Sequence, residues 1–232
     1  MTERLRSGQG GASYACGSGT SLTTSVTVVT HPVIDHRLAS LRDLRTDRDA
    51  FRDDLAKVTR LLAYEALRDL KTEPGTVTTP VCDGAAVRLI REVVLIVPVL
   101  RAGLGMVQAI QDVVPLTEVA HVGVRRDEQT LSPVVYLNRL PSTLSGRRVV
   151  VCDPMVATGG SLIEVCNLVR SQGGTDIVVL SAIASEQGIA ALTAAHPELR
   201  LYCAALDPVL NEVGFIIPGL GDAGDRLFGP PD

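Results

Sequence analysis

Aromatic side chains are scarce in this chain of 232 residues: they make up 3% of it, and tryptophan does not occur. Because 46% of the residues are nevertheless hydrophobic, the core has to be built from valine, leucine, isoleucine and alanine. The length suits one large α/β domain better than two small ones. The net charge of −4 and the pI near 5.6 argue against a generic nucleic-acid binder.

Paired cysteines and long apolar runs are also missing. The five cysteines are odd in number and show no paired spacing, which argues against a disulfide framework. Cys152 and Cys166 lie in apolar runs, so we expect buried thiols and a reduced, cytoplasmic setting. The longest strongly apolar run, 93–100, is far too short to span a membrane. Arg4 and Arg6 precede a polar stretch, so no secretory signal is predicted.

The rest of the pattern predicts an α/β domain behind a flexible tail. Residues 1–24 are rich in glycine, serine and threonine, which is typical of a flexible segment. From residue 25 onward, strand-like runs alternate with segments of helical spacing, which indicates a mostly parallel sheet with helices on both faces. The expected strands are 26–29, 93–100, 119–124, 133–137, 148–152, 177–182 and 199–205, and the expected helices are 47–70, 104–114, 161–171 and 187–195.

The most informative segment is 149–165, where a predicted strand leads into a short loop of small residues and then into a predicted helix. Amides at the start of a helix are unpaired and the helix dipole favours negative charge there, so this arrangement suits a phosphate. Thr158 and Ser161 can add hydroxyl donors. Gly159 and Gly160 allow positive φ and close backbone approach.

A carboxylate distinguishes this loop from the common phosphate-binding loops. No Gly-Lys-Ser/Thr follows the glycines, and the dinucleotide fingerprint Gly-x-Gly-x-x-Gly is absent. Asp153 instead stands where the strand ends. An acid followed by an anion cradle suits a ligand with both hydroxyls and a phosphate, such as a ribose 5-phosphate. An ordinary βα turn with small residues is the alternative.

Two arginine-bearing segments carry further candidate groups. Arg101 leaves an apolar strand at its carboxyl end, before two glycines and a predicted helix. It is either paired with a nearby carboxylate or aimed at a phosphate or diphosphate. The charged tip of the predicted hairpin, 122–131, is either a solvated loop or a mobile lid that contributes one arginine to the ligand.

Two other segments lie outside the strand–helix rhythm. The glycine-rich stretch 214–226 exposes backbone amides and carbonyls, which suit the reading of a flat imide or amide edge. His31, Asp35 and His36 have a spacing that could bind a metal, but a subunit contact or a segment that closes the fold is favoured.

These motifs resemble uracil phosphoribosyltransferases. The resemblance rests on Cys152–Ser161 and Ile217–Arg226, supported by 31–37, 61–65 and 134–137, in one order along residues 25–232. It implies a type I phosphoribosyltransferase fold over 25–232, with a C-terminal base-binding hood and a β-hairpin lid. It also implies a homo-oligomeric, dimeric or tetrameric, cytoplasmic enzyme that converts uracil and 5-phosphoribosyl 1-diphosphate (PRPP) into UMP and diphosphate.

The resemblance assigns roles to individual residues. PRPP would be bound by Arg101, Arg126, Asp153, Pro154, Met155, Val156, Ala157, Thr158, Gly159, Gly160, Ser161 and Asp222. Uracil would be read by Ile216, Gly221, Asp222 and Ala223, and the catalytic residues would be Asp222, Arg126 and Arg101. Mg²⁺ would sit on the diphosphate without direct protein ligands, and GTP is an effector of some family members.

Two positions depart from the family pattern, and two other functions stay open. Arg125 in the lid and Phe215 before the uracil-reading stretch stand where the family usually shows tyrosine. Pro154 after Asp153 agrees with the uracil branch, since other phosphoribosyltransferases often show two adjacent acids there. The alternatives are a non-enzymatic regulator that senses nucleotides, with RNA as a partner, and a phosphoribosyltransferase for another base such as a purine.

Overall fold

The computed structural model describes residues 25–126 and 133–230. Nine strands form the central sheet, in the order β1-β11-β10-β8-β4-β6-β7, with β5 beside β4 and β9 beside β10. The expected tail, 1–24, and the tip of the expected lid, 127–132, lie outside the described residues. The strands of this sheet are β1 (Ser25–Val28), β4 (Val94–Leu100), β5 (Thr117–Val119), β6 (Val122–Arg126), β7 (Pro133–Asn138), β8 (Arg148–Cys152), β9 (Met155–Val156), β10 (Asp176–Ser185) and β11 (Arg200–Asp207).

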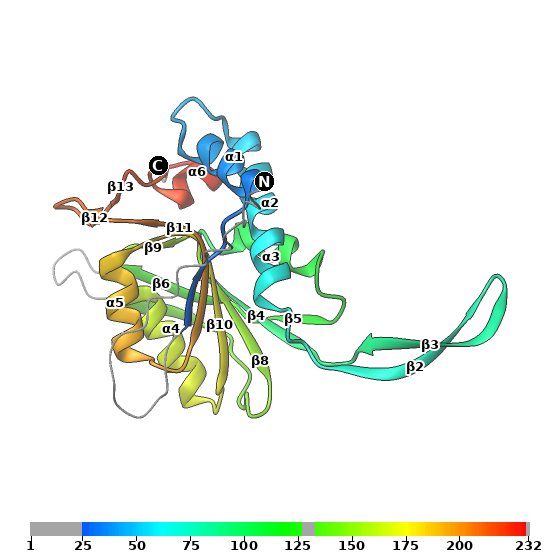
Figure 1. Cartoon of the computed structure of the whole chain (residues 1–232). Helices are drawn as coiled ribbons and strands as arrows, with labels where there is room; N and C mark the ends of the chain where they lie inside the picture. The colour runs from blue at the N-terminus through cyan, green and yellow to red at the C-terminus, as the bar shows by residue number, and fades with distance from the viewer. Residues whose placement is uncertain (1–24, 127–132, 231–232) are drawn as a thin grey trace, which may run out of the picture.

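The sheet is parallel except for its last pair, as the sequence predicts. β6 and β7 form an antiparallel hairpin, and the other paired strands run in one direction. Helices cover both faces, with α2 and α3 on one side and α4 and α5 on the other (Figure 1). The helices are α1 (Pro32–Arg42), α2 (Arg48–Ala66), α3 (Leu104–Gln111), α4 (Gly160–Ser171), α5 (Glu186–Ala195) and α6 (Ala223–Phe228).

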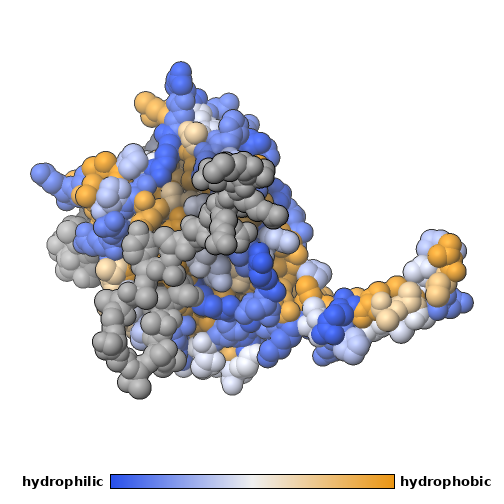
Figure 2. Space-filling model, viewed as in Figure 1, coloured by the Kyte–Doolittle hydropathy of each residue, from blue (hydrophilic) through white to orange (hydrophobic). Residues whose placement is uncertain are grey.

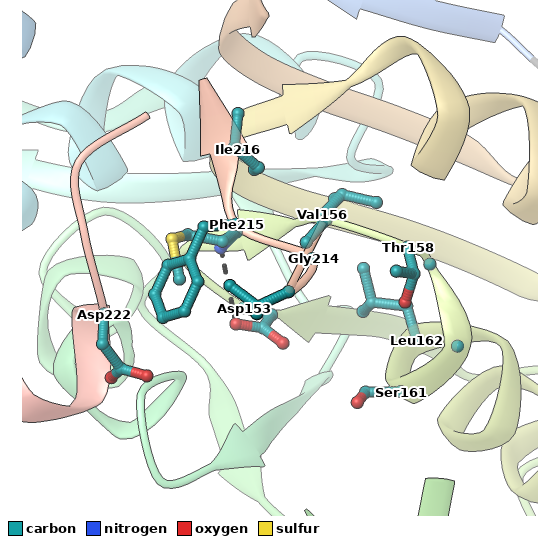
Figure 3. A pocket seen from close by; sticks show the side chains of 14 residues that line it. Asp153, Val156, Thr158, Ser161, Leu162, Gly214, Phe215, Ile216 and Asp222 are labelled. Atoms are coloured by element: carbon teal, nitrogen blue, oxygen red, sulfur yellow. Dashed lines mark hydrogen bonds between the residues drawn. The ribbon is translucent and has the colours of Figure 1, made fainter. Parts of the chain in front are cut away.

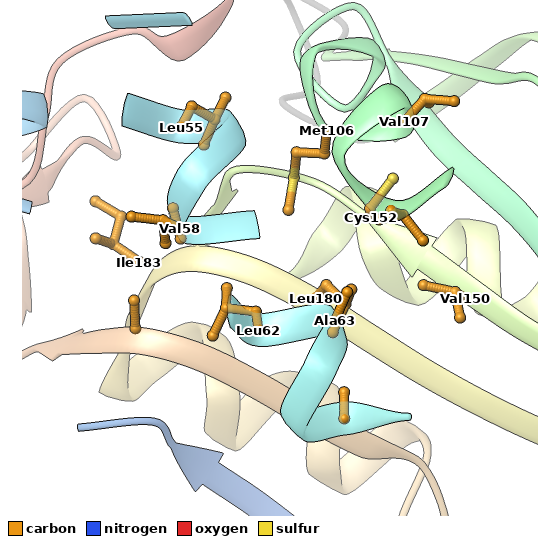
Figure 4. Packing of buried hydrophobic residues seen from close by; sticks show 14 of the residues in the cluster. Leu55, Val58, Leu62, Ala63, Met106, Val107, Val150, Cys152, Leu180 and Ile183 are labelled. Atoms are coloured by element: carbon orange, nitrogen blue, oxygen red, sulfur yellow. The ribbon is translucent and has the colours of Figure 1, made fainter. Parts of the chain in front are cut away.

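The core consists of two aliphatic layers, because successive side chains of a strand point to opposite faces of the sheet. On β8, Val150 and Cys152 belong to the layer under α2 and α3, whereas Val149 and Val151 belong to the layer under α4 and α5. Figure 4 shows residues of α2 and α3 packed over β8 and β10 in the first of these layers. This packing fixes the carboxyl ends of β8 and β10 at one edge.

Several elements, including the short helix α6, were not predicted from the sequence, and the two largest are a helix and a hairpin. The helix α1 begins after His31, whose Nδ1 accepts a hydrogen bond from the Val33 amide at 3.1 Å. Its residues Ile34, Leu38 and Leu41 are buried, so this segment closes the core over α2. The second element is an antiparallel hairpin of β2 (Thr72–Thr79) and β3 (Cys82–Ile90), which projects away from the body as an arm (Figure 1).

One expected strand is two strands in the structure, whereas the burial of the cysteines agrees with the sequence. The prediction of one strand over 119–124 was wrong: β5 ends at Val119 and β6 begins at Val122, because β4 pairs with each of them in turn. Cys152 and Cys166 are buried free thiols, as expected. Among the described residues, no helix is both long and apolar enough to cross a membrane.

Candidate active site

A pocket of about 350 Å³ opens at the carboxyl edge of the sheet. One wall is the loop after β8, and the opposite wall comes from the C-terminal segment and Asp222 (Figure 3). The lining residues are Asp153, Met155, Val156, Ala157, Thr158, Gly159, Gly160, Ser161, Leu162, Val213, Gly214, Phe215, Ile216 and Asp222. Two segments singled out in the sequence, 153–162 and 213–222, therefore face each other.

The first wall has the predicted anion-binding geometry. Gly159 adopts a left-handed conformation with φ of +82° and precedes α4, whose N-terminus is capped by no described side chain. The amides of the first turn are therefore available to a ligand. Thr158 and Ser161 add hydroxyls to the same wall of the pocket. Together they form a cradle that suits a phosphate.

The N-terminus of α5 braces the cradle, and this contact, unlike the helix itself, was not predicted from the sequence. The hydroxyl of Ser185 donates to the Ala157 carbonyl at 2.6 Å and accepts from the Gly188 amide at 2.8 Å. A Cβ on Gly188 would lie 2.3 Å from the Ala157 carbonyl oxygen, so no larger residue fits there without moving the loop. The pattern Ser-Glu-Gln-Gly does signal a helix N-cap, but nothing in it shows the second bond to the loop.

Asp153 stands at the edge of the cradle with an altered acidity. Burial raises the pKa of Asp153 to about 7. The hydrogen bond from the Met155 amide, 3.4 Å long, opposes this rise, and the charge of Asp222 adds to it. The carboxyl group therefore lacks the partners that a structural acid of this burial usually has. Hydroxyl donors of a ligand would supply them.

The second wall belongs to a C-terminal hood. The hood comprises the short hairpin of β12 (Val209–Leu210) and β13 (Ile216–Ile217), the following loop and α6. Ile216 is buried against the core, and Phe215, which is 41% exposed, lies between Asp153 and Asp222 in the view of Figure 3. Asp222 caps α6 by accepting a hydrogen bond from the Asp225 amide at 2.9 Å.

Two arginines clamp the hood onto the body. Arg42 makes a bidentate pair with Asp207, with both N···O distances at 2.7 Å, and donates to the Gly219 carbonyl at 2.8 Å. The Gly219 amide in turn donates to Asp207 at 3.0 Å. Arg226 donates to the carbonyls of Leu220 and Asp43 at 3.0 and 2.8 Å. Such bidentate and charge-assisted bonds hold the backbone of the hood in one geometry.

Arg101 lies next to the hood but does not line the pocket. Its Nη2 donates to the carboxylate of Asp225 at 3.1 Å, so the ion pair considered from the sequence is present. The turn after β4 can lie this close to the end of β8 because residue 103 is glycine: a Cβ there would clash with the Cys152 carbonyl oxygen. The turn after β4 therefore packs directly on the strand end that carries Asp153.

Of the other predicted site residues, some lie beside the pocket and some are buried away from it. Arg126 ends β6 opposite Pro133, and Pro133 Cγ would lie 3.8 Å from a Cβ on Gly160, so the base of the lid borders the cradle. Pro154 is buried and accepts from β10 through its carbonyl instead of lining the pocket. Gly221 borders a neighbouring hollow behind Asp222, and Ala223 is buried in the core.

The parallel sheet with helices on both faces, and the site at its carboxyl edge, are those of the type I phosphoribosyltransferase fold. The family model described as uracil phosphoribosyltransferase matches residues 28–230. The chain belongs to the uracil phosphoribosyltransferase family.

Individual relatives agree over nearly the whole chain. Uracil phosphoribosyltransferase of Clostridium kluyveri is 46% identical over 206 residues, which are 89% of this chain and 99% of that protein. The Symbiobacterium thermophilum enzyme of the same name is 47% identical over 204 residues, 88% of this chain and 98% of that one. A solved structure of an Aquifex aeolicus protein superposes with a TM-score of 0.83 at 34% identity, covering 88% of this chain and 98% of that chain.

Proposed function

We propose that this protein transfers the 5-phosphoribosyl group from PRPP to uracil and releases UMP and diphosphate. One observation carries the proposal: the phosphate cradle with Asp153 and the hood with Ile216 and Asp222 face each other across a single pocket. The cradle suits the 5-phosphate, Asp153 the ribose hydroxyls, and the backbone of the hood the edge of the base. Family membership supports the same assignment.

The chemistry needs orientation and charge neutralisation more than covalent help. As diphosphate leaves the anomeric carbon, uracil N1 approaches from the opposite face, and rigid grips on both substrates supply the alignment. Arg101 and Arg126 would neutralise the leaving diphosphate. Asp222, on the pocket wall, would either stabilise the developing positive charge or orient a uracil N–H.

Mg²⁺ is proposed to enter as a complex with the diphosphate group of PRPP. Among the described residues, no group of three His, Cys, Asp or Glu side chains could hold a metal ion by itself. The donor set therefore fits an ion carried by the substrate better than one resident in a protein cage. When bound, the ion would supply additional charge neutralisation on the leaving group.

The test is UMP formation by the full chain from uracil, PRPP and Mg²⁺, with hypoxanthine, guanine and adenine in parallel. Uracil-dependent release of diphosphate supports the proposal, and turnover of a purine instead would assign the chain to another base. Absence of turnover together with salt-dependent RNA binding would favour the regulator.

The arginines offer a sharper test of the diphosphate contacts. Arg101→Ala and Arg126→Ala should each lower kcat/KM for PRPP by about 10–150-fold, since a charge-assisted hydrogen bond contributes roughly 1.5–3 kcal/mol. Arg125→Ala should cost much less, because neighbouring residues of a strand point to opposite sides. Steady-state kinetics at saturating uracil measure this. If Arg125→Ala is the more damaging lid variant, the diphosphate contact belongs to Arg125.

A substitution under the cradle should act without touching a substrate. Gly188→Ala places a methyl group against the Ala157 carbonyl and should cost about 1–3 kcal/mol of stability by overpacking. The displaced loop should also lower kcat/KM for PRPP by about tenfold or more. Gly75→Ala is the control, because it lies on the β2–β3 arm and the closest atom to its Cβ would be Cδ1 of the flexible Leu89 side chain, not a backbone carbonyl. Unchanged PRPP kinetics in Gly188→Ala would show that α5 does not position the loop.

We also propose a homo-oligomer in the cytoplasm. An isolated two-stranded ribbon is marginally stable in water, yet the β2–β3 arm extends from the body and exposes Val77 and Val81 by 41% and 93%. Figure 2 shows apolar surface along the arm. A second copy would cover it, and light scattering tests for a dimer or tetramer. GTP is a further proposed effector, and its addition to the UMP assay tests for a response.

A further inference from the structure

One residue bridges two groups that the proposed reaction uses. The carboxylate of Asp225 accepts from Arg101 Nη2 at 3.1 Å, and the backbone amide of Asp225 donates to Asp222 Oδ1 at 2.9 Å. Arg101 follows β4, whereas Asp222 belongs to the hood, more than a hundred residues later. Asp225 therefore links Arg101, the proposed diphosphate-binding residue, to Asp222, which caps α6 in the hood.

We propose that Asp225 is a positioning residue that fixes the guanidinium of Arg101 for diphosphate and joins it to the hood. The inference rests on the proposed function, which places diphosphate at Arg101. A guanidinium carries five N–H donors in a planar fork. The contact with Asp225 engages Nη2, so the other donors remain to meet phosphate oxygens while the plane of the fork is held.

The ion pair between Arg101 and Asp225 is too exposed to contribute much to the stability of the fold. The side chains of Arg101 and Asp225 are 50% and 40% exposed, and ion pairs of such exposure contribute little to folding. Their effect is on the freedom of Arg101. An arginine that is free to rotate loses much of that freedom when it binds a ligand, whereas one that is already held loses less.

The packing around the pair is close enough to depend on a glycine. A Cβ on Gly224 would lie 3.1 Å from Asp222 Oδ1 and 3.4 Å from Arg101 Nη2. The small residue therefore lets the guanidinium approach the first turn of α6. Arg101, Asp222 and Asp225 consequently form one cluster beside the pocket, with contributions from the turn after β4 and from the hood.

The experiment compares Asp225→Asn with Asp49→Asn. Asp49 is the matched control because it also lies in the first turn of a helix and pairs with an arginine, Arg52, at the exposed surface. Calorimetric titration with inorganic diphosphate and Mg²⁺ gives Kd, and kinetics give KM for PRPP. Asp225→Asn should raise both about tenfold, since a neutral amide oxygen accepts from Arg101 more weakly than the carboxylate does and the guanidinium regains rotamer freedom, with Tm and KM for uracil nearly unchanged. Asp49→Asn should raise neither.

A double-mutant cycle distinguishes positioning from a general disturbance. In an Arg101→Ala background, Asp225→Asn should leave the diphosphate Kd unchanged, because the residue acts through Arg101.

Three results would overturn the inference. If the Arg101 and Asp225 substitutions raise the diphosphate Kd by factors that multiply in the double mutant, Asp225 does not act through Arg101. Tighter diphosphate binding by Asp225→Asn would show that the carboxylate competes with the ligand. An unchanged Kd in a folded Asp225→Asn would show no role. Failure of the proposed function is distinct, because wild-type protein would then form no UMP whatever the variants do.

Discussion

Cytosine should be used about 10⁴-fold less efficiently than uracil, because a site built to hydrogen-bond one edge leaves buried groups unpaired with another. Uracil presents a carbonyl at C4 and an N–H at N3, and cytosine presents the reverse pattern. The proposed readers are backbone groups around Ile216 and Gly221–Ala223. The loop is held by Arg42 on Asp207 and Gly219, and by Arg226 on the carbonyls of Leu220 and Asp43. It therefore cannot easily rearrange to fit the reversed edge.

Competition between the two bases for one limited supply of PRPP measures this ratio directly. Arg226→Lys serves as an internal test of rigidity, because a lysine keeps the charge but lacks the fork that reaches several carbonyls. The variant should lose part of the discrimination while still forming UMP. Comparable turnover of cytosine by the wild-type protein would contradict the assignment of this segment as the base reader.

Asp153→Asn should lower kcat/KM for PRPP by about 10²- to 10⁴-fold, because charge-assisted hydrogen bonds to two ribose hydroxyls, worth about 1.5–3 kcal/mol each, are lost. Among the described residues, the Asp153 carboxyl accepts just the long hydrogen bond from the Met155 amide, so the loss should fall on the ligand and not on the fold. KM for uracil should change little. Initial rates with PRPP varied at saturating uracil give the value.

The raised pKa of Asp153 turns the same variant into a stability test. The pKa is about 7 in the folded chain against the ordinary value of 3.8. Between these values the folded state binds a proton that the unfolded state has lost, so wild-type stability falls as pH rises through this window. Without ligand, Asp153→Asn should therefore match the wild-type Tm near pH 4 and exceed it at pH 8. A lower Tm at pH 8, with activity retained in the folded fraction, would mean that the acid is structural.

Much of the domain could be predicted because its local and global signals agree. The apolar run 94–100 is buried on both faces of the sheet, and the stretch 149–161 contains a strand, an acid, glycines and a helix start in sequence. Each of these features has a direct structural consequence. The loop between strand and helix and the mostly parallel character of the sheet follow from them.

The remainder depends on contacts that a single sequence does not display. The arm, 72–90, has a proline and glycines inside its two strands, which interrupts the strand pattern, and its pairing is local to itself. The bond from Ser185 to Ala157, the clamp by Arg42 and the bridge by Asp225 join positions between 28 and 177 residues apart. Nothing in the local pattern at either end announces such partners.

The most direct measurement of the central claim is a crystal structure of the full chain with UMP. The account predicts the phosphate on the amides of 158–161, the ribose hydroxyls on Asp153, and the uracil edge on the backbone of 216 and 221–223. A single ligand would then span both walls of the pocket. A phosphate bound away from the start of α4, or a base that leaves the hood untouched, would contradict it.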